Sequence, residues 1–491
     1  MVEIKKIVEQ NKWWVLGKDF EYFDEDMKKF KEKIVIVERK DLEIRTGNVY
    51  TIEGPRQIGK TTWIKQKIKK LIESGFDPNK ICYFSLDRVY SRKELSKILD
   101  YFISTKGENI FIFLDEIGYV KDWEIEIKSF LDRNLSKVCI VITGSPFRMR
   151  EKISELIGRG IEGNRYFIKP LSFRDFLLNF SSGGYLLDYL FKTVKKINEE
   201  TFLKTKKLVE TLKKNKIVFN DLNEIEEKVK SLLDFVEILD FWFYNYYLIT
   251  GGFPEIIDEF IKRDAIPPEK YEKFANALFT GMEFETKIDI RKLIEKLPYF
   301  IAYRVNLVNL TNEFEEGTSF QTLQKYLRIL EDKFIIRVLN SVNKKLKERS
   351  RGLKKIYFTD VVMLYTSILL SEGKFGNAFE YIKNEILTNE NYLGKIIENL
   401  VAISLVDFIE EPFIDYKKFL FFLYDGNKEI DFILKKDNKV FAIECMSEDI
   451  PKINAESILI LTKDNFEIKN NIIKVPVSVF LSLIEKSKVN I

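Results

Sequence analysis

Residues 54–61 read Gly-Pro-Arg-Gln-Ile-Gly-Lys-Thr, in which a glycine is followed, after four residues, by Gly-Lys-Thr. This spacing is typical of a phosphate-binding loop (P-loop) that joins a β-strand to an α-helix. The β-rich run 49–52 precedes the loop, and the apolar residues of 62–74 have helical spacing. A chance match in a glycine-containing turn is the alternative, but the flanking strand and helix patterns favour a P-loop.

Each type of residue in the loop has a physical role in holding phosphates. Gly54 and Gly59 allow the backbone to curl so that its N–H groups point at an anion. Lys60 can reach the β- and γ-phosphates of a nucleotide, and Thr61 offers a hydroxyl to Mg²⁺. The residues expected to bind the nucleotide are Gly54, Pro55, Arg56, Gln57, Ile58, Gly59, Lys60, Thr61 and Thr62.

A second stretch, 111–116, is an apolar run that ends in two acids. A run that is apolar on both faces is typical of a central parallel strand, and ligands bind at the carboxyl ends of such strands. Asp115 is predicted to hold the Mg²⁺ that Thr61 also contacts. Glu116 is predicted to orient or deprotonate the attacking water. Without the P-loop, two acids at the start of a loop would be the better interpretation.

Strand and helix patterns alternate along the first third of the chain. After the P-loop helix, further helices are predicted from Ser91 and from Trp123. Buried strands are predicted at 81–86, 109–114, 138–143 and 165–170. A series of βαβ units forms a parallel sheet with helices on both faces. We therefore predict an α/β fold built on the parallel sheet of a P-loop NTPase.

The composition excludes several classes of chemistry. The 491 residues include no histidine, which excludes Ser-His triads, histidine metal sites and histidine-based nucleases. The three cysteines lie in apolar runs and are expected to be reduced core residues rather than a disulfide set or a zinc site. The formal charge is +4, from 80 basic and 76 acidic residues, so net charge predicts no polyanionic partner.

The charge pattern also bears on location. The N-terminus is charged throughout, which argues against a signal peptide. The longest aromatic-aliphatic stretch, 231–250, contains three acidic residues, which argues against a membrane span. A cytoplasmic protein without a membrane partner is the simplest expectation.

The middle of the chain is predicted to be helical. Residues 186–239 are rich in Lys and Glu and are expected to form a helical insertion, and Gly-Gly-Phe-Pro-Glu at 251–255 is a strong break between helices. Helices at 291–302 and 321–334, followed by a strand at 334–339, resemble a winged helix. Such a unit reads DNA with its second helix, but that helix carries few basic residues, so a packing role is favoured.

The C-terminal third has a different chemistry. A helix begins at 393, and two paired strands are predicted at 429–434 and 440–446. Three carboxylates on these elements are predicted to converge on one metal ion, as hard oxygen ligands do; they are Glu398, Asp431 and Glu444. Nucleases of the PD-(D/E)XK type use this helix–strand–strand order.

Those nucleases place a lysine two positions after the last carboxylate, where this chain has Met446. Loss of that cation removes a group that stabilises developing phosphate charge or positions water. Lys428, Lys435 or Lys439 could substitute from a neighbouring position. An inactive nuclease fold is therefore favoured over an active one, and a sheet domain with merely solvated acids is the simplest alternative.

Together, these segments resemble a family of archaeal and bacterial AAA+-like ATPases. Its members carry an N-terminal P-loop domain, a winged-helix-like middle and a C-terminal restriction-endonuclease-like domain. The resemblance implies binding and hydrolysis of ATP. The matching stretches are 54–61, 111–116, 141–145, 156–159, 170–173, 251–255, 355–360, 394–399, 429–433 and 442–444.

Two further contacts with the γ-phosphate are expected. ATPases of the AAA+ type place a polar residue after the fourth predicted strand, where Ser145 or Thr143 could act, although an ordinary turn is the alternative. An arginine that reaches the γ-phosphate stabilises transferred charge. Arg159 is the first candidate, Arg148 and Arg165 compete with it, and a solvated surface arginine is the alternative for each. The expected catalytic residues are Lys60, Glu116, Ser145 and Arg159.

The length of 491 residues suits about three domains. The predicted divisions are an N-terminal extension (1–45), a P-loop ATPase domain (46–180), a helical lid or insertion (181–285), a winged-helix-like domain (286–365) and a restriction-endonuclease-like domain (366–491).

Three functions fit these features. The leading hypothesis is a Mg²⁺-dependent ATPase that acts as a nucleotide switch. The alternatives are an ATP-regulated, metal-dependent DNA nuclease, and a nucleic-acid-binding or scaffold protein that holds ATP without hydrolysing it. The expected partners are ATP and ADP, with DNA or a protein as the further partner. An arginine supplied by a neighbouring subunit would require an oligomer.

Overall fold

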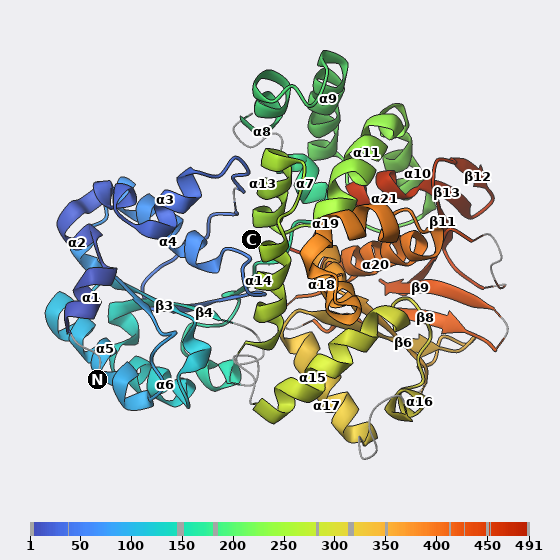
Figure 1. Ribbon diagram of the computed structural model, residues 1–491. Helices are drawn as coiled ribbons and strands as arrows, with labels where there is room; N and C mark the ends of the chain where they lie inside the picture. The colour runs from blue at the N-terminus through green and yellow to red at the C-terminus, as the bar shows by residue number, and fades with distance from the viewer. Residues whose placement is uncertain are drawn as a thin grey trace.

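The computed structural model describes residues 4–37, 39–144, 152–179, 185–280, 284–312, 319–348, 352–411, 414–426, 428–447, 451 and 453–488. Figure 1 shows two parts that each contain a β-sheet. The N-terminal part, in blue and cyan, lies on the left, and the C-terminal part, in orange and red, lies on the right. The helices α13 (Pro254–Arg263) and α14 (Pro268–Phe279) lie between them.

The N-terminal sheet has five strands in the order β2-β3-β4-β1-β5, and all of its pairings are parallel. Its strands are β1 (Asn48–Glu53), β2 (Ile81–Ser85), β3 (Ile110–Asp115), β4 (Val138–Gly144) and β5 (Arg165–Phe167). The helices that connect them are α4 (Lys60–Glu73), α5 (Arg92–Lys106) and α6 (Trp123–Asn134). This arrangement confirms the predicted α/β fold with a parallel P-loop sheet.

Successive residues of the central strands pack on opposite faces of this sheet, because side chains alternate along a strand. Phe111 and Phe113 of β3 belong to the same apolar core as Ile64 of α4. Ile112 and Leu114 belong to a second core, which α5 and α6 cover. Burial on both faces explains why the strands read as continuous apolar runs.

The N-terminal extension covers the edge strand β2. It contains α1 (Ile4–Gln10), α2 (Trp13–Leu16) and α3 (Glu25–Lys31). The Asn11 side chain both donates to the Tyr83 carbonyl (2.8 Å) and accepts from the Tyr83 N–H (2.7 Å). The Trp13 Nε1 donates to the Ile81 carbonyl at 2.9 Å. These bonds pair backbone groups that an uncovered edge strand would expose.

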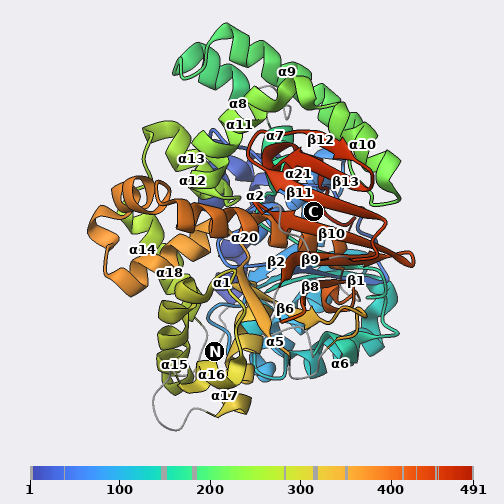
Figure 2. The same cartoon turned by 90° about the vertical axis from the view of Figure 1, so that its right-hand side faces the viewer.

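The middle of the chain is helical, as predicted. Its first helices are α7 (Phe173–Asn179), α8 (Tyr185–Asp188), α9 (Glu199–Lys214), α10 (Leu222–Lys230), α11 (Val236–Trp242) and α12 (Leu248–Thr250). The helices that follow α14 are α15 (Phe284–Lys296), α16 (Leu307–Asn312) and α17 (Phe320–Asp332). Figure 2 shows α9 above β12 and β13 of the second sheet, with α10 beside them.

The second sheet is mixed and has eight strands, in the order β12-β13-β11-β10-β9-β8-β6-β7. Its strands are β6 (Ile336–Val342), β7 (Lys354–Phe358), β8 (Leu420–Tyr424), β9 (Glu429–Lys436), β10 (Lys439–Cys445), β11 (Ser457–Thr462), β12 (Glu467–Lys469) and β13 (Ile472–Pro476). Its helices are α18 (Val361–Glu372), α19 (Ala378–Tyr381), α20 (Glu390–Ile409) and α21 (Val477–Leu483).

The strand of the expected winged helix, β6, belongs to this second sheet. It pairs with β7 on one side and, at Asn340, with Phe421 of β8 on the other. The predicted boundary between 286–365 and 366–491 therefore runs through one continuous sheet. Division of the chain into the five predicted domains remains a prediction.

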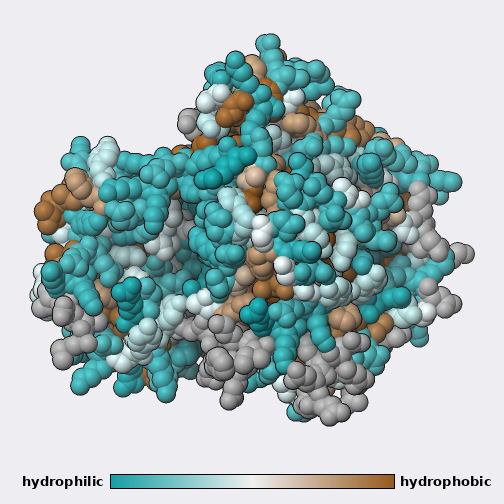
Figure 3. All heavy atoms as spheres, in the orientation of Figure 1, coloured by the Kyte–Doolittle hydropathy of each residue, from teal (hydrophilic) through white to brown (hydrophobic). Residues whose placement is uncertain are grey.

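The face of the molecule drawn in Figure 3 is mostly hydrophilic, with scattered apolar residues. Among the described residues, no helix combines the length and the apolar composition that crossing a membrane requires.

Candidate functional site

The P-loop joins β1 directly to α4. Gly59 immediately precedes the helix with a left-handed φ of 96°, a conformation that favours glycine. A Cβ atom on Gly54 would lie 2.2 Å from the Ile168 carbonyl oxygen, so this position has no room for a side chain. The N-terminus of α4, the end of a helix that binds anions at phosphate sites, therefore begins directly at this tight loop.

Lys60 lies inside the loop. Its Nζ donates to the carbonyls of Gly54 (3.1 Å) and Pro55 (3.0 Å) and lies 3.5 Å from the Glu116 carboxylate. The side chain is only 4% exposed. The predicted phosphate-binding cation and the predicted water-orienting acid are therefore direct neighbours.

Asp115, at the end of β3, is held by three hydroxyl groups. The Thr61 hydroxyl donates to its Oδ2 at 2.6 Å, and the Tyr83 hydroxyl donates to the same oxygen at 3.2 Å. The Thr143 hydroxyl donates to Oδ1 and also accepts from the Glu116 backbone N–H at 3.2 Å. Burial, followed by repulsion from Glu116, raises the pKa of Asp115.

Two cavities border this centre. One has a volume of about 520 Å³ and lies between the N-terminal extension and the Thr61–Asp115–Glu116 group. The other has a volume of about 540 Å³ and lies between the P-loop, α3 and the helices α13 and α14. Volumes of this size are typical of small-molecule sites. The P-loop part of the larger cavity is lined by Gln57, Ile58, Gly59 and Thr62.

The helix α14 closes one side of the P-loop. The Gln57 side chain donates to the Lys273 carbonyl at 3.0 Å. Lys273 pairs with Glu255 at 2.8 Å, and Lys270 pairs with the same carboxylate at 2.8 Å. Sequence reasoning missed Lys273 and Tyr83 as neighbours of the site, because no motif marks them and only the fold brings them there.

The structure does not bring Arg159 to the P-loop of its own chain. Its Nε lies 2.7 Å from Asp132, and the next residue, Gly160, accepts from the Val49 N–H at the start of β1. The P-loop follows the other end of β1, about 16 Å away at a strand rise of about 3.3 Å per residue. The side chain therefore cannot contact a phosphate bound in the same chain.

The other residues expected to contact the γ-phosphate are Arg165, Thr143, Ser145 and Arg148, and the structure places only the first two. Arg165 is buried and pairs with Glu53 at 2.9 Å, at the end of β1. Thr143 bonds to both acids, through the Asp115 side chain and the Glu116 backbone. Ser145 and Arg148 lie outside the described residues, so the choice between Ser145 and Thr143 as the γ-phosphate contact remains a prediction.

A second polar centre lies on the C-terminal sheet. The structure brings together Glu398 of α20, Asp431 of β9 and Glu444 of β10, and it adds a cation that sequence reasoning missed. The Nζ of Lys355, on β7, lies 2.9 Å from Glu398 and 2.8 Å from Asp431, and it also contacts Glu429. Glu444 accepts from the Asp431 backbone N–H at 3.0 Å.

Burial and mutual repulsion set the charges of this centre. Burial and the nearby Asp431 raise the pKa of Glu398 to about 7 and that of Glu444 to about 9. Burial alone would lower the pKa of Lys355, but the surrounding anionic groups raise it well above its usual value. The ammonium is therefore charged at neutral pH. In the described part of the chain, no group of three acidic or cysteine side chains is arranged to hold a metal ion. Binding of a metal ion by Glu398, Asp431 and Glu444 remains a prediction.

A junction of backbone contacts joins the two parts of the molecule. The Leu171 N–H, four residues beyond β5, donates to the Gly252 carbonyl at 2.8 Å, and the Gly252 N–H donates to Asp360 at 2.8 Å. Asp360 precedes α18 and also accepts from the Val362 N–H. The segments 170–173, 251–255 and 355–360, far apart in sequence, thus meet at one place.

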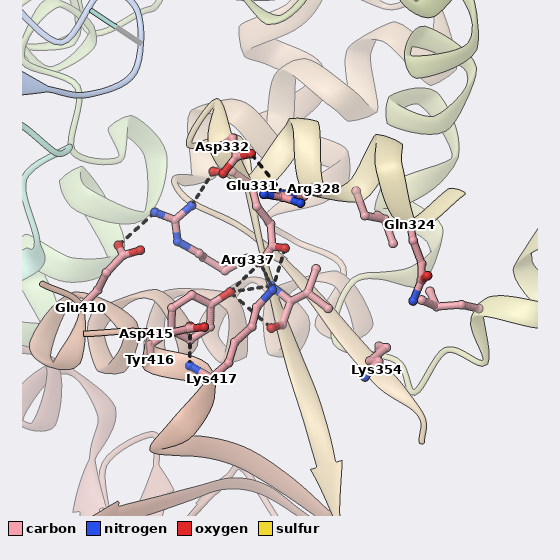
Figure 4. A pocket seen from close by; sticks show the side chains of 13 residues that line it. Gln324, Arg328, Glu331, Asp332, Arg337, Lys354, Glu410, Asp415, Tyr416 and Lys417 are labelled. Carbon is pink, nitrogen blue, oxygen red and sulfur yellow. Dashed lines mark hydrogen bonds and ion pairs between the residues drawn. The ribbon is translucent and has the colours of Figure 1, made fainter. Parts of the chain in front are cut away.

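A buried group of ion pairs forms a second junction. Glu410, which follows α20, pairs with Lys169 at 2.8 Å and with Arg337 of β6 at 3.0 Å. Figure 4 shows Arg337 and Glu410 pointing towards one another at the side of a cavity of about 320 Å³. Burial raises the pKa of Glu410, but Arg337 and Lys169 outweigh it and lower the pKa to about 2.

Comparisons with protein families match two parts of the chain. Residues 46–177 match a family described as an AAA domain, and residues 242–373 match a domain of unknown function. An uncharacterized protein of Methanocaldococcus jannaschii is 24% identical over 509 residues, which cover 95% of this chain and 90% of the relative. An uncharacterized protein of Haemophilus influenzae is 22% identical over 441 residues, covering 86% of this chain and 88% of the relative.

Comparison with solved structures matches the ORC2 protein of Aeropyrum pernix in ADPNP–ADP complexes, with 12% identity and a TM-score of 0.33. That comparison covers 67% of this chain and 89% of the ORC2 chain. The RuvB Holliday junction branch migration motor of Thermotoga maritima has 14% identity and a TM-score of 0.26, over 68% of this chain and 89% of RuvB. The AAA-domain match spans the five-stranded sheet, the P-loop and both acids, so the N-terminal part is similar to AAA domains in sequence and has the fold of a P-loop nucleotide-binding ATPase.

Proposed function

We propose that this protein is a Mg²⁺-dependent ATPase that acts as a nucleotide switch. The observation that carries the proposal is the pairing of P-loop residues with the two acids after β3. The Thr61 hydroxyl and the Asp115 carboxylate are 2.6 Å apart, and Lys60 lies 3.5 Å from Glu116. A chance P-loop match has no reason to meet these acids.

The residues present fit ATP and Mg²⁺. Thr61 and Asp115 supply neighbouring hard oxygen atoms, the ligand type that Mg²⁺ prefers. When bound there, Mg²⁺ would neutralise charge on the phosphate oxygens. The phosphates would be held by backbone N–H groups of residues 54–62, except Pro55, which has none. The Lys60 ammonium would also bind them, and it would leave the Gly54 and Pro55 carbonyls to do so.

Glu116 is the residue that acts on water in this proposal. Its carboxylate would orient the attacking water and accept a proton from it. Thr143 is a positioning residue, because one hydroxyl group bonds both the Asp115 side chain and the Glu116 backbone. Tyr83 supports Asp115 from β2.

A conformational change at the P-loop would reach the C-terminal part through the two junctions described above. The Gly54 backbone packs against Ile168, three residues before Leu171, so a change in the loop reaches the segment that contacts Gly252. Gly252 in turn contacts Asp360, which precedes α18. Lys169, next to Ile168, pairs with Glu410, which pairs with Arg337 of β6. Loss of the γ-phosphate moves contacting segments in other nucleotide switches.

The remaining partners follow from the site. Arg159 would have to serve a neighbouring copy of the chain, so we propose an oligomer if Arg159 assists catalysis. DNA or a protein is the proposed further partner. A cytoplasmic location is proposed from the acids in the longest apolar stretch, which argue against a membrane span.

Nucleotide binding tests the proposal. Lys60→Ala removes the buried cation of the loop, and Lys70→Ala is the control, since Lys70 lies on the same helix and is half-exposed. Binding of a fluorescent ATP analogue in Mg²⁺ should be lost in Lys60→Ala and kept in Lys70→Ala. Equal binding by both variants would exclude the P-loop as the nucleotide site. Binding by the wild type without any turnover would favour the non-hydrolysing scaffold.

A further inference from the structure

The centre on the C-terminal sheet is built around an ammonium group. Lys355 is 1% exposed, and its Nζ contacts carboxylates of Glu398, Glu429 and Asp431. An ammonium has three N–H donors, and this one meets three carboxylates from two different elements. No donor is left over for a phosphate oxygen of a substrate, which a catalytic lysine would have to contact.

Two of the carboxylate oxygens that do not face Lys355 also have protein donors. The second oxygen of Asp431 accepts from the Cys445 N–H at 3.0 Å, and Glu429 pairs with Arg304 at 2.9 Å. The Glu398 oxygen that faces Lys355, Oε1, also accepts from the Tyr357 hydroxyl at 2.6 Å. A divalent ion such as Mg²⁺ needs several oxygen ligands directed at one point, whereas these oxygens are directed at protein donors.

The position that a nuclease lysine would occupy supplies no cation to this centre, because it holds Met446. Met446, two residues after Glu444, has a side chain that is 43% exposed. Its backbone N–H pairs with Leu461 of β11. The cation of the centre thus comes from β7, which lies on the other side of β6 and β8 in the sheet order.

We propose that Lys355 is the resident cation of this centre, in the place of a divalent metal ion, and that the centre fastens β7, β9 and α20 together instead of cleaving nucleic acid. Removal of the ammonium would then leave buried carboxylates that a divalent cation can bridge. This inference is independent of the proposed ATPase, because it involves none of the P-loop residues.

The test is Mn²⁺ binding to the nucleotide-free full chain, measured by electron paramagnetic resonance. Lys355→Met removes the charge and keeps an apolar side chain of similar length. Lys354→Met is the matched control on the same strand, because the Lys354 side chain donates to Asn340 and not to the carboxylates of this centre. Asp431→Asn, made in the wild type and in Lys355→Met, identifies ions bound at this centre.

We expect no Asp431-dependent Mn²⁺ binding in the wild type or in Lys354→Met, where Asp431-dependent binding is binding that Asp431→Asn abolishes. Lys355→Met should bind one Mn²⁺ ion in an Asp431-dependent way. Its Tm without metal should be lower than that of the wild type, and Mn²⁺ should restore part of the lost Tm. Asp431-dependent Mn²⁺ binding by the wild type, or Asp431-dependent cleavage of DNA in Mn²⁺, would overturn the proposal. A folded Lys355→Met chain that binds no ion would also overturn it. If Lys355→Met does not fold, the wild type and Asp431→Asn decide the question alone.

Discussion

At the scale of single residues, the nucleotide site depends on one hydroxyl group that serves two acids. Thr143 donates to the Asp115 carboxylate and accepts from the Glu116 backbone. Asp115 is buried next to another acid, so its orientation depends on the donors around it. The hydroxyl of Thr143 therefore fixes the position of Asp115, the proposed metal ligand, relative to Glu116, the proposed water-orienting residue.

Thr143→Ala should lower kcat for ATP hydrolysis by about 10- to 100-fold, the usual effect of losing a group that orients a metal ligand. KM for ATP should change little, because the P-loop contacts remain. Thr143→Ser keeps the hydroxyl and should restore most of the activity. Steady-state kinetics of the two variants check this, and an equal loss in both would show that the methyl packing matters rather than the hydroxyl.

The sequence was sufficient to predict that Lys60 and Thr61 would lie near Asp115 and Glu116, because each of the two pairs belongs to a local motif at the carboxyl end of a predicted parallel strand. It was not sufficient for Lys355. That residue lies 43 positions from Glu398 and 76 from Asp431, and only the pairing of β6, β7 and β8 brings it to the carboxylates. No local pattern encodes that pairing.

At the scale of elements, the segments 170–173, 251–255 and 355–360 form one junction. Gly252 lies against the backbone of Leu171, where a Cβ atom would come within 2.0 Å of the Leu171 carbonyl oxygen. The Gly-Gly-Phe-Pro-Glu turn is therefore more than a break between helices. It is the contact through which the segment after β5 meets α13 and Asp360.

Gly252→Ala should destabilise the protein by about 1–3 kcal/mol or more, because backbone atoms must move to make room. Gly394→Ala, on α20, is the control, since a Cβ there meets nothing within 4 Å and alanine favours a helix. Urea unfolding of both variants measures the difference. A Gly252→Ala chain as stable as Gly394→Ala would show that the junction is not tightly packed.

The positions of the strands and helices along the chain were more predictable than the segments that each of them packs against. The strand and helix patterns of residues 49–143 agree with β1 to β4 to within about two residues, because buried parallel strands read as apolar runs. The position of Arg159 could not be read in the same way. Which end of β1 its segment meets depends on how the chain returns to the sheet after β4, and the sequence pattern does not show this.

At the scale of the whole molecule, Glu410 links the P-loop part to the C-terminal sheet. Lys169 and Arg337 lower its pKa from 4.5 to about 2 despite burial. A carboxylate with a lowered folded-state pKa adds stability above its unfolded-state pKa and loses it as the pH falls through the folded-state value. Glu410 should therefore add about 3 kcal/mol that is complete above about pH 4.5 and lost towards pH 2.

Glu410→Gln should accordingly be less stable than the wild type at pH 7, and the difference should narrow as the pH falls from about 4.5 towards about 2. Urea unfolding at a series of pH values measures the difference. Glu411→Gln is the control at the neighbouring position, where no ion pair is present among the described residues. A difference that does not change with pH would contradict the role assigned to this carboxylate.

The central claim is that the P-loop and the acids after β3 form a working ATPase. The most direct test is Mg²⁺-dependent phosphate release from ATP by the wild type and by Glu116→Gln, with and without double-stranded DNA. The account predicts turnover by the wild type and its loss in Glu116→Gln, with nucleotide binding intact. Turnover that is equal in the two proteins would contradict the assignment of Glu116 and of the site.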